Sequence, residues 1–131
     1  MPKRLADHIT PLVITFNEAP NLKRCLDKLT WAKRVVVLDS GSTDETLTIA
    51  RSYANVDIVN RPFDSFAGQC NFGLDQITSG WVLSMDCDYE LSDELVNEIQ
   101  GMDVDSSVAF EVSFVYRIYG RPLRATLYAS A

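Results

Sequence analysis

Cysteine is scarce in this sequence, and its spacing excludes two classes of protein. The chain has 3 cysteines in 131 residues, and Cys25, Cys70 and Cys87 lie far apart without a CxxC pair. A secreted disulfide framework uses paired cysteines, and a structural zinc site uses closely spaced ones. The sequence therefore predicts reduced thiols and a cytoplasmic location.

Long apolar runs, linkers and internal repeats are also missing. No uninterrupted apolar run approaches the ~18 residues of a membrane span, and the opening segment MPKRLADHIT lacks the apolar region of a signal peptide. A chain of 131 residues without low-complexity segments is long enough for one domain with a buried core. We therefore expect a single globular domain over residues 1–131 with no transmembrane segment, and we leave open a contact with the inner face of the membrane.

Positive charge is in the minority. The chain carries 12 Lys and Arg residues against 18 Asp and Glu residues, for a formal net charge of −6. This balance argues against nucleic acid as a partner, because a nucleic-acid-binding surface is basic. An anionic ligand would need a local metal ion or helix N-termini. The only histidine, His8, precedes the first apolar run, and we interpret it as a surface residue rather than a catalytic base.

Short apolar runs alternate with segments of helical periodicity. The expected strands are residues 11–16, 34–39, 56–60 and 81–86. The expected helix starts are a cap at Asn17, a capping box formed by Ser42 and Glu45, and a cap at Ser92. The third helix is expected to bury a stripe of Phe66, Cys70, Leu74 and Ile77. This alternation predicts an α/β fold in which helices flank a mostly parallel sheet.

The pattern changes after residue 107. Apolar residues recur at every second position over 108–118, residues 120–122 suit a turn, and residues 123–128 suit a returning strand. We therefore expect an antiparallel C-terminal hairpin that pairs with the main sheet. The chain stops at Ala131, directly after this strand, which predicts that it is a fragment of a longer chain.

Polar residues follow the first, second and fourth expected strands, at the edge where open parallel sheets bind ligands. Asp39 could accept hydrogen bonds from a ribose hydroxyl or a base N–H, but an Asp-Ser-Gly sequence also suits a turn or a helix cap. Asp44 could also contact a ligand, but it suits the first turn of the following helix, where the macrodipole favours a carboxylate. Both interpretations of each residue stay open at this point.

The segment WVLSMDCDYEL, residues 81–91, leads an apolar strand directly into three acidic residues. In an extended chain alternate side chains share a face, so Asp86, Asp88 and Glu90 would converge. The repulsion of two such charges costs roughly 1 kcal/mol in water and about 4 kcal/mol near a protein surface, which favours a cation between them. Hard carboxylate oxygens suit Mg²⁺ or Mn²⁺ bound together with a substrate diphosphate. A solvated acidic loop leading into a helix is the alternative.

Four segments in combination resemble the family 2 glycosyltransferases, which have the GT-A fold. They are TFNEAPNLKRCLDKL, VVVLDSGSTDETLTIA, FAGQCNFGLD and WVLSMDCDYEL, and they follow the family's order over about residues 10–100. Trp31, just before the second segment, is similar to a feature of bacterial members that add a glucose-type sugar to the lipopolysaccharide core. The resemblance implies a donor-binding part at about residues 10–106 and the start of an acceptor-side sheet at 107–131.

The resemblance also implies an activity. It is that of a metal-dependent, inverting glycosyltransferase, which moves a hexose from a nucleotide-diphosphate sugar to a hydroxyl acceptor. The implied donor is UDP-glucose-like. The implied acceptor is the lipopolysaccharide core, another cell-surface glycan or a lipid-linked glycan.

The same resemblance assigns residues to the site. The implied nucleotide-sugar-binding residues are Thr15, Phe16, Glu18, Asp39, Ser40, Asp44, Gln69, Asn71, Asp86 and Cys87. Asp86 and Asp88 correspond to the DxD element, which would hold Mn²⁺ or Mg²⁺. Such a metal bridges the carboxylates to the donor's diphosphate and neutralises the leaving group as the glycosidic bond breaks.

The chain departs from the family's pattern in two places. Cys70 precedes Asn71 where the family commonly has Arg or Lys, so one positive contact to the donor is missing. The family's general base is a carboxylate well downstream of the DxD element, but the only acid within residues 107–131 is Glu111, inside an expected strand. The catalytic base therefore stays unknown.

Two other functions remain as alternatives. A donor-binding module without turnover of its own would show the same donor-side residues. An aspartate-nucleophile phosphohydrolase also places Asp-x-Asp after an apolar strand. It would need a small hydroxyl residue and a glycine soon afterwards, where this chain has Tyr89 and Glu90. It would also need a downstream lysine, although none follows Lys33.

Overall fold

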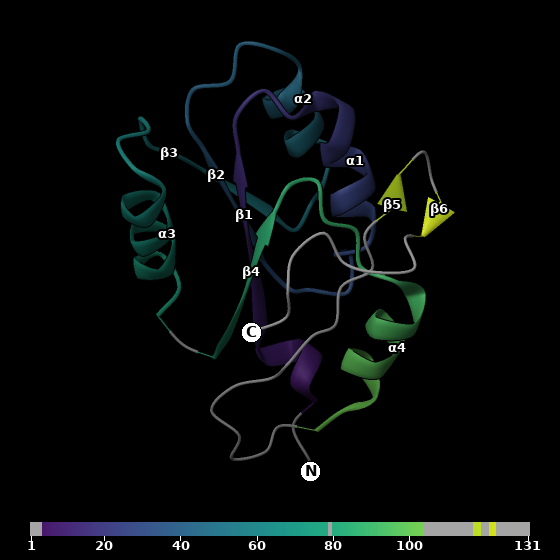
Figure 1. Cartoon of the computed structure of the whole chain (residues 1–131). Coiled ribbons are helices and arrows are strands. Elements are labelled where there is room, and N and C mark those ends of the chain that lie inside the picture. Colours follow the sequence, from purple (N-terminus) through teal and green to yellow (C-terminus); the bar gives the residue numbers. More distant parts are fainter. Residues whose placement is uncertain (1–3, 79, 104–116, 119–120, 123–131) are drawn as a thin grey trace.

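Helices and strands alternate along the chain in the computed structural model, which describes residues 4–78, 80–103, 117–118 and 121–122 (Figure 1). The main sheet contains β1 (Ile9–Thr15), β2 (Val35–Asp39), β3 (Val56–Asn60) and β4 (Trp81–Asp86). The helices around it are α1 (Ala19–Asp27), α2 (Thr46–Arg51), α3 (Phe66–Asp75) and α4 (Asp93–Gly101), and a 3₁₀ helix (Leu5–His8) precedes β1. The four expected strands and the α/β fold are confirmed. Within the described ranges, no helix has both the length and the apolar character that crossing a membrane requires.

The sheet has the strand order β3-β2-β1-β4, and its strands are all parallel. The chain passes from β1 to β2 and on to β3 in one direction, and then crosses back to place β4 on the other side of β1. Ligands of open α/β sheets bind at the carboxyl ends of the strands, where such a reversal occurs. In this sheet the reversal lies between β1 and β4, next to Thr15 and Asp86.

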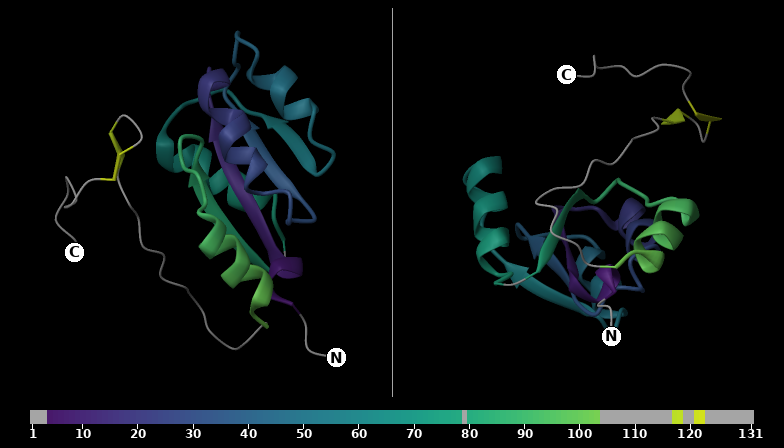
Figure 2. Two further views of the ribbon diagram at one scale, coloured as in Figure 1. Left: turned by 90° about the vertical axis from the view of Figure 1, so that its right-hand side faces the viewer. Right: turned by 90° about the horizontal axis from the view of Figure 1, so that it is seen from below.

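Helices cover both faces of the sheet. The helices α1, α2 and α4 lie on one face and α3 lies on the other (Figures 1 and 2). Alternate strand residues serve the two layers: Val13 and Val37 join the larger core cluster, whereas Leu12 and Leu38 pack towards α3. Every residue of β2 is buried, which explains why this strand reads as a continuous apolar run.

The helix starts follow the expectations only in part. Ser92 caps α4 as expected, because its Oγ accepts a hydrogen bond from the Leu95 amide at 3.1 Å. The expected capping box at α2 is wrong, since this helix begins at Thr46. The Ser42 hydroxyl donates to the Asp39 carboxylate, and its oxygen accepts from the Asn17 amide instead of from an amide of the helix.

The buried face of α3 differs from the expected stripe. Phe66 and Leu74 are 59% and 43% exposed, whereas Gln69 and Gly73 are buried. A Cβ on Gly73 would lie 2.7 Å from Leu12 Cδ2, so the missing side chain allows the helix to approach β1 closely. The helix therefore packs through a face that the spacing of apolar residues does not reveal.

We expect Gly73→Val to lower the free energy of unfolding by about 1–3 kcal/mol, the usual cost of overpacking a core. Leu12 is fully buried, so it cannot turn into solvent to make room for the added methyl groups. Gly101→Val is a matched control, because a Cβ on Gly101 would meet no atom within 4 Å. Urea unfolding measures the stability of both variants. If Gly73→Val were as stable as Gly101→Val, Leu12 would accommodate the added methyl groups without loss of stability.

The C-terminal part is described at two short strands. β5 (Arg117–Ile118) and β6 (Arg121–Pro122) pair antiparallel, so the chain reverses as expected. The expected bounds of the turn, 120–122, are wrong, because Arg121 and Pro122 belong to the second strand. Among the described residues this pair forms a separate sheet, and the expected pairing with the main sheet is not seen there. The expected strand positions 108–116 and 123–128 lie outside the described residues.

Candidate functional site

The Asp39 carboxylate lies at the carboxyl end of β2 and is fully buried. Its Oδ1 accepts hydrogen bonds from the Thr15 hydroxyl at 2.7 Å and from the Ser42 hydroxyl at 2.6 Å. Its Oδ2 accepts hydrogen bonds from the amides of Gly41 at 2.9 Å and Ser42 at 2.8 Å. These donors match the acceptor capacity of an ionised carboxylate. Asp39 therefore joins the end of β1 to the loop that follows β2.

The protonation of Asp39 reflects these contacts. Burial raises the pKa of Asp39, but the hydrogen bonds from Ser42, Thr15 and Gly41 outweigh burial and hold the pKa below the ordinary value of an aspartate. The turn interpretation of Asp39 is confirmed, and Gly41 supplies the positive φ of 97° that the turn requires. A contact between Asp39 and a ligand stays a proposal.

Asn17 ties the loop after β1 to the loop after β2. Its φ of 51° is positive, a conformation that asparagine adopts more readily than most residues. Its Oδ1 accepts hydrogen bonds from the amides of Thr43 at 2.8 Å and Asp44 at 3.3 Å. Its own amide donates to Ser42 Oγ at 2.8 Å. The expected cap at Asn17 is therefore wrong, because its side chain is used by the neighbouring loop and Glu18 is the N-cap of α1.

Asp44 and Glu18 connect the same two loops. The Asp44 carboxylate accepts hydrogen bonds from the Thr46 hydroxyl, from the Thr46 amide at 2.9 Å and from the Ala19 amide at 3.2 Å. The Thr46 hydroxyl is the main cause of the lowered pKa of Asp44. The expected place of Asp44 in the first turn of α2 is wrong, because Asp44 precedes the N-cap Glu45, although its carboxylate accepts from the first amide of the helix. The Glu18 amide donates to Thr46 Oγ1 at 2.9 Å, while its carboxylate accepts from Asn21 Nδ2 of its own helix at 3.0 Å.

Gln69 is buried between the loops that follow β2 and β3. Its Nε2 donates to Ser40 Oγ at 2.9 Å and to the Arg61 carbonyl at 3.2 Å. Its Oε1 accepts a hydrogen bond from Arg61 Nη1 at 2.7 Å. Both ends of the amide are engaged within the protein, so Gln69 positions Ser40 and Arg61.

Arg61 is a residue of this edge that the sequence motifs do not identify. Its guanidinium makes two hydrogen bonds of 3.0 Å to Asp64 and lies over the Phe72 ring, 5.3 Å from the centroid. Its amide donates to the Asp39 carbonyl at 2.9 Å. The signal that could have found it is position, because Arg61 directly follows an expected strand. Since Asp64 balances its charge, Arg61 does not simply replace the cation missing at Cys70.

Asp86 and Asp88 are exposed at the carboxyl end of β4, on either side of Cys87. Asp86 is in register with Ile14, which places it beside the end of β1. Cys87 is 2% exposed and belongs to the core. A hydrogen bond with the Cys25 thiol and burial both raise the pKa of Cys87. The two carboxylates are therefore accessible to a ligand, whereas Cys87 could contact one only through its backbone.

The expected extended segment with three carboxylates on one face ends at Asp86, because β4 ends there and Cys87 and Asp88 form a turn. The Tyr89 amide donates to the Asp86 carbonyl at 3.0 Å, which forms a turn and ends the extended pattern. Glu90 instead forms an ion pair with Arg24 of α1, with 3.7 Å between Oε2 and Nε. The acidic pair at this edge is Asp86 and Asp88.

The donor set of this pair fits a divalent metal that arrives with its substrate. Mg²⁺ is commonly held by one or two carboxylates, with water and substrate phosphates as its other ligands. In the part of the chain that the structure describes, no group of three or more His, Cys, Asp or Glu side chains could hold a metal alone. Asp86 and Asp88 therefore suit Mn²⁺ or Mg²⁺ bound together with a diphosphate.

A hollow of about 510 Å³ opens beside the loops of β1, β2 and β3. It is lined by Phe16, Ser40, Pro62 and Phe63. Phe16, which the family resemblance places near the base, is 57% exposed. Asn71, another implied donor-binding residue, is exposed on α3. The structure thus brings Phe16 and Ser40 together at one concave surface.

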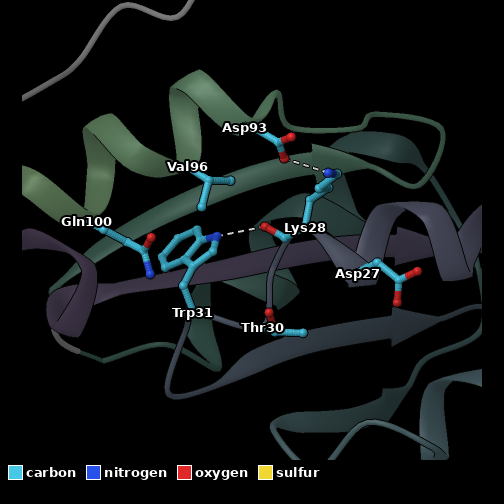
Figure 3. A pocket seen from close by; sticks show the side chains of 7 residues that line it. All are labelled: Asp27, Lys28, Thr30, Trp31, Asp93, Val96 and Gln100. Atoms are coloured by element: carbon cyan, nitrogen blue, oxygen red, sulfur yellow. Dashed lines mark hydrogen bonds and ion pairs between the residues drawn. The ribbon is translucent and has the colours of Figure 1, made fainter.

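A second hollow, of about 400 Å³, lies between α4 and the segment after α1 (Figure 3). Lys28 Nζ contacts Asp93 Oδ1 at 2.6 Å, and Trp31 Nε1 donates to the Lys28 carbonyl at 2.7 Å. Asp27 Oδ1 accepts a hydrogen bond from the Tyr53 hydroxyl at 2.6 Å. Trp31 therefore helps to pack the segment after α1 and is not among the residues of the hollow at Phe16.

Known proteins resemble the chain over most of its length. A family model described as Glycosyl transferase family 2 matches residues 11–127. An uncharacterized glycosyltransferase of Rickettsia bellii is 32% identical over 120 residues, which are 88% of this chain and 40% of that protein. The lipopolysaccharide core biosynthesis glycosyltransferase LpsC of Rhizobium meliloti is 31% identical over 91 residues, 66% of this chain and 34% of that protein. The chain thus spans 40% or less of the length of these relatives.

Two solved structures share the arrangement of the sheet and its helices. S. aureus TarS 1–349 superposes with a TM-score of 0.59 and 27% identity, over 69% of this chain and 30% of that one. Glucosyl-3-phosphoglycerate synthase from Mycobacterium tuberculosis, crystallised with Mn²⁺, UDP and glucosyl-3-phosphoglycerate, superposes with a TM-score of 0.52 and 22% identity. That match covers 64% of this chain and 36% of the synthase, and it concerns the fold alone.

Proposed function

Because the chain belongs to glycosyl transferase family 2 and has the GT-A fold, we propose that it binds a nucleotide-diphosphate sugar for hexosyl transfer to a hydroxyl acceptor. One observation carries the proposal. Asp86 and Asp88 are exposed at the reversal point of the sheet, where β4 lies beside β1 and the Asp39 loop lies on the other side of β1. A pair of metal ligands and a nucleotide-side loop at one edge are what such a donor requires.

The residues of the edge divide into two groups. Asp86 and Asp88 hold Mn²⁺ or Mg²⁺, which when bound supplies positive charge to the diphosphate leaving group. Phe16 and Ser40 face the nucleotide, while Asp39 fixes Thr15 and the turn behind them. A donor held at its nucleotide and at its diphosphate is oriented for attack on its sugar carbon.

The acceptor and the stereochemistry form the finer part of the proposal. The 31% identity to LpsC supports a lipopolysaccharide-core or related glycan acceptor, and the family resemblance supports inversion. Glu111, the one acid among residues 107–131, lies outside the described residues, so the catalytic base stays unidentified. The buried thiols of Cys25 and Cys87 support a cytoplasmic protein.

A donor-binding module without its own turnover is the second candidate. It is favoured by the placement of the described polar residues, which follow β1, β2 and β4 and belong to the donor side of the site. The phosphohydrolase interpretation loses its support, because the family model matches residues 11–127.

Calorimetry with UDP-glucose tests the proposal. We expect binding to tighten at least about tenfold, or about 1.4 kcal/mol, when Mn²⁺ is added, because the metal offsets repulsion between the carboxylates and the diphosphate. EDTA should reverse this gain, and Mg²⁺ should reproduce it. Equal affinities with and without metal would contradict the metal site. If the chain binds neither UDP-glucose nor UDP, the proposed function as a whole is contradicted.

A further inference from the structure

Phe63 is exposed at the same edge but has no role in the function described so far. Phe63 is 58% exposed and Phe16 is 57% exposed, and both line the hollow of about 510 Å³. Large apolar side chains are usually buried, and a concave apolar surface with few polar groups is typical of a small-molecule site. The two rings therefore indicate a ligand with an apolar face.

The segment that carries Phe63 is held in place by hydrogen bonds. Arg61 makes two hydrogen bonds of 3.0 Å to Asp64, and its amide donates to the Asp39 carbonyl at 2.9 Å. Phe63 lies between the two residues of this ion pair. Phe16 belongs to the loop after β1, so the two rings come from the strands on either side of β2. A backbone segment fixed in this way loses little conformational entropy when a ligand binds to its side chains.

The lining of the hollow favours a planar base over the other parts of a nucleotide sugar. A diphosphate requires cations or free amides, and a hexose requires several polar partners, whereas Phe16, Phe63 and Pro62 offer apolar faces. Ser40 Oγ accepts a hydrogen bond from Gln69, so its own proton points elsewhere and can be donated to a carbonyl oxygen. A pyrimidine base combines a stacking face with such carbonyl oxygens.

We propose that Phe63, together with Phe16, binds the nucleobase of the donor by stacking. This inference rests on the proposed function, because the base must belong to the nucleotide whose diphosphate lies at Asp86 and Asp88. Phe63 is then a binding residue that the sequence motifs do not include. It contributes affinity for the base and none for the diphosphate.

The experiment compares UDP with inorganic pyrophosphate, each titrated in the presence of Mn²⁺. We expect Phe63→Ala to weaken UDP binding by about 5- to 150-fold, the range for loss of one base–aromatic stack. Pyrophosphate binding should not change, because pyrophosphate has no base. Phe63→Tyr keeps the ring and should retain the affinity for UDP. Phe66→Ala is the matched control, since Phe66 is 59% exposed but does not line the hollow.

The possible results separate the inference from its premise. If the wild-type protein binds UDP and the Phe63→Ala variant binds it equally well, the stacking role is overturned. Equal losses of UDP and pyrophosphate also overturn it, because the side chain would then act on the whole site. A wild-type protein that binds no UDP refutes the proposed function, and the stacking role with it. Thermal unfolding verifies that each variant is folded.

Discussion

Asp88→Ala is expected to abolish the effect of Mn²⁺ on UDP binding and to leave the fold intact. With only Asp86 remaining, the metal loses a charged ligand, and the diphosphate then faces the carboxylate of Asp86 without a counter-ion. We expect UDP binding in Mn²⁺ to weaken by about 10- to 150-fold, which corresponds to the 1.5–3 kcal/mol of one charged contact. Calorimetry with and without Mn²⁺ measures the change. Because Asp88 is exposed, the midpoint of thermal unfolding should stay close to that of the wild type.

Glu90→Ala is the matched control for this experiment. Glu90 belongs to the same acidic segment, but it pairs with Arg24 rather than with the other carboxylates. Its removal should leave the response to Mn²⁺ in place, whereas Asp86→Ala should behave like Asp88→Ala. A full Mn²⁺ response in both aspartate variants would rule out this pair as the metal site.

Asp39→Asn is expected to lower the free energy of unfolding by about 2–5 kcal/mol. The carboxylate accepts hydrogen bonds from hydroxyls and amides on both oxygens. An asparagine places an NH₂ group against two of these donors, and each lost bond to a charged group is worth about 1.5–3 kcal/mol. Urea unfolding at neutral pH measures the loss. Asp86→Asn is the control, because Asp86 ends the strand on the other side of β1 but is exposed.

The loss should depend on pH in a definite direction. The pKa of Asp39 is lower in the folded chain than its ordinary value, so the ionised form stabilises the fold. This contribution is complete above the unfolded pKa of about 3.9 and disappears as the pH falls through the folded pKa. The difference in stability between wild type and Asp39→Asn should therefore be constant near neutral pH and shrink below about pH 4. A difference that stays the same in acid would show that the charge of Asp39 contributes nothing.

The strands and the ligand edge could be predicted from the sequence because their signals are local. The run that forms β2 is apolar at successive positions, since both faces of that strand are buried. Asp39 and Asp86 end apolar runs, so their places at the carboxyl ends of strands follow directly.

The remaining features depend on contacts between distant segments. Ser42 could cap a helix in isolation, but its hydroxyl donates to Asp39 and accepts from the Asn17 amide. The packing of α3 depends on Gly73 meeting Leu12, a contact that no spacing of apolar residues encodes. Arg61 carries no motif, and only the folded chain places it against Gln69. In each case the deciding contact comes from a residue of another element.

The strand order has a consequence for how the two halves of the site form during folding. β1, β2 and β3 pair with their neighbours in the sequence, so the nucleotide-side loops are assembled from a local part of the chain. β4 pairs with β1 only after the chain has passed through β2, β3 and α3. Closing that longer loop costs more chain entropy, and contacts of higher contact order form more slowly. We therefore expect the carboxylates of Asp86 and Asp88 to reach their place after the nucleotide side has formed.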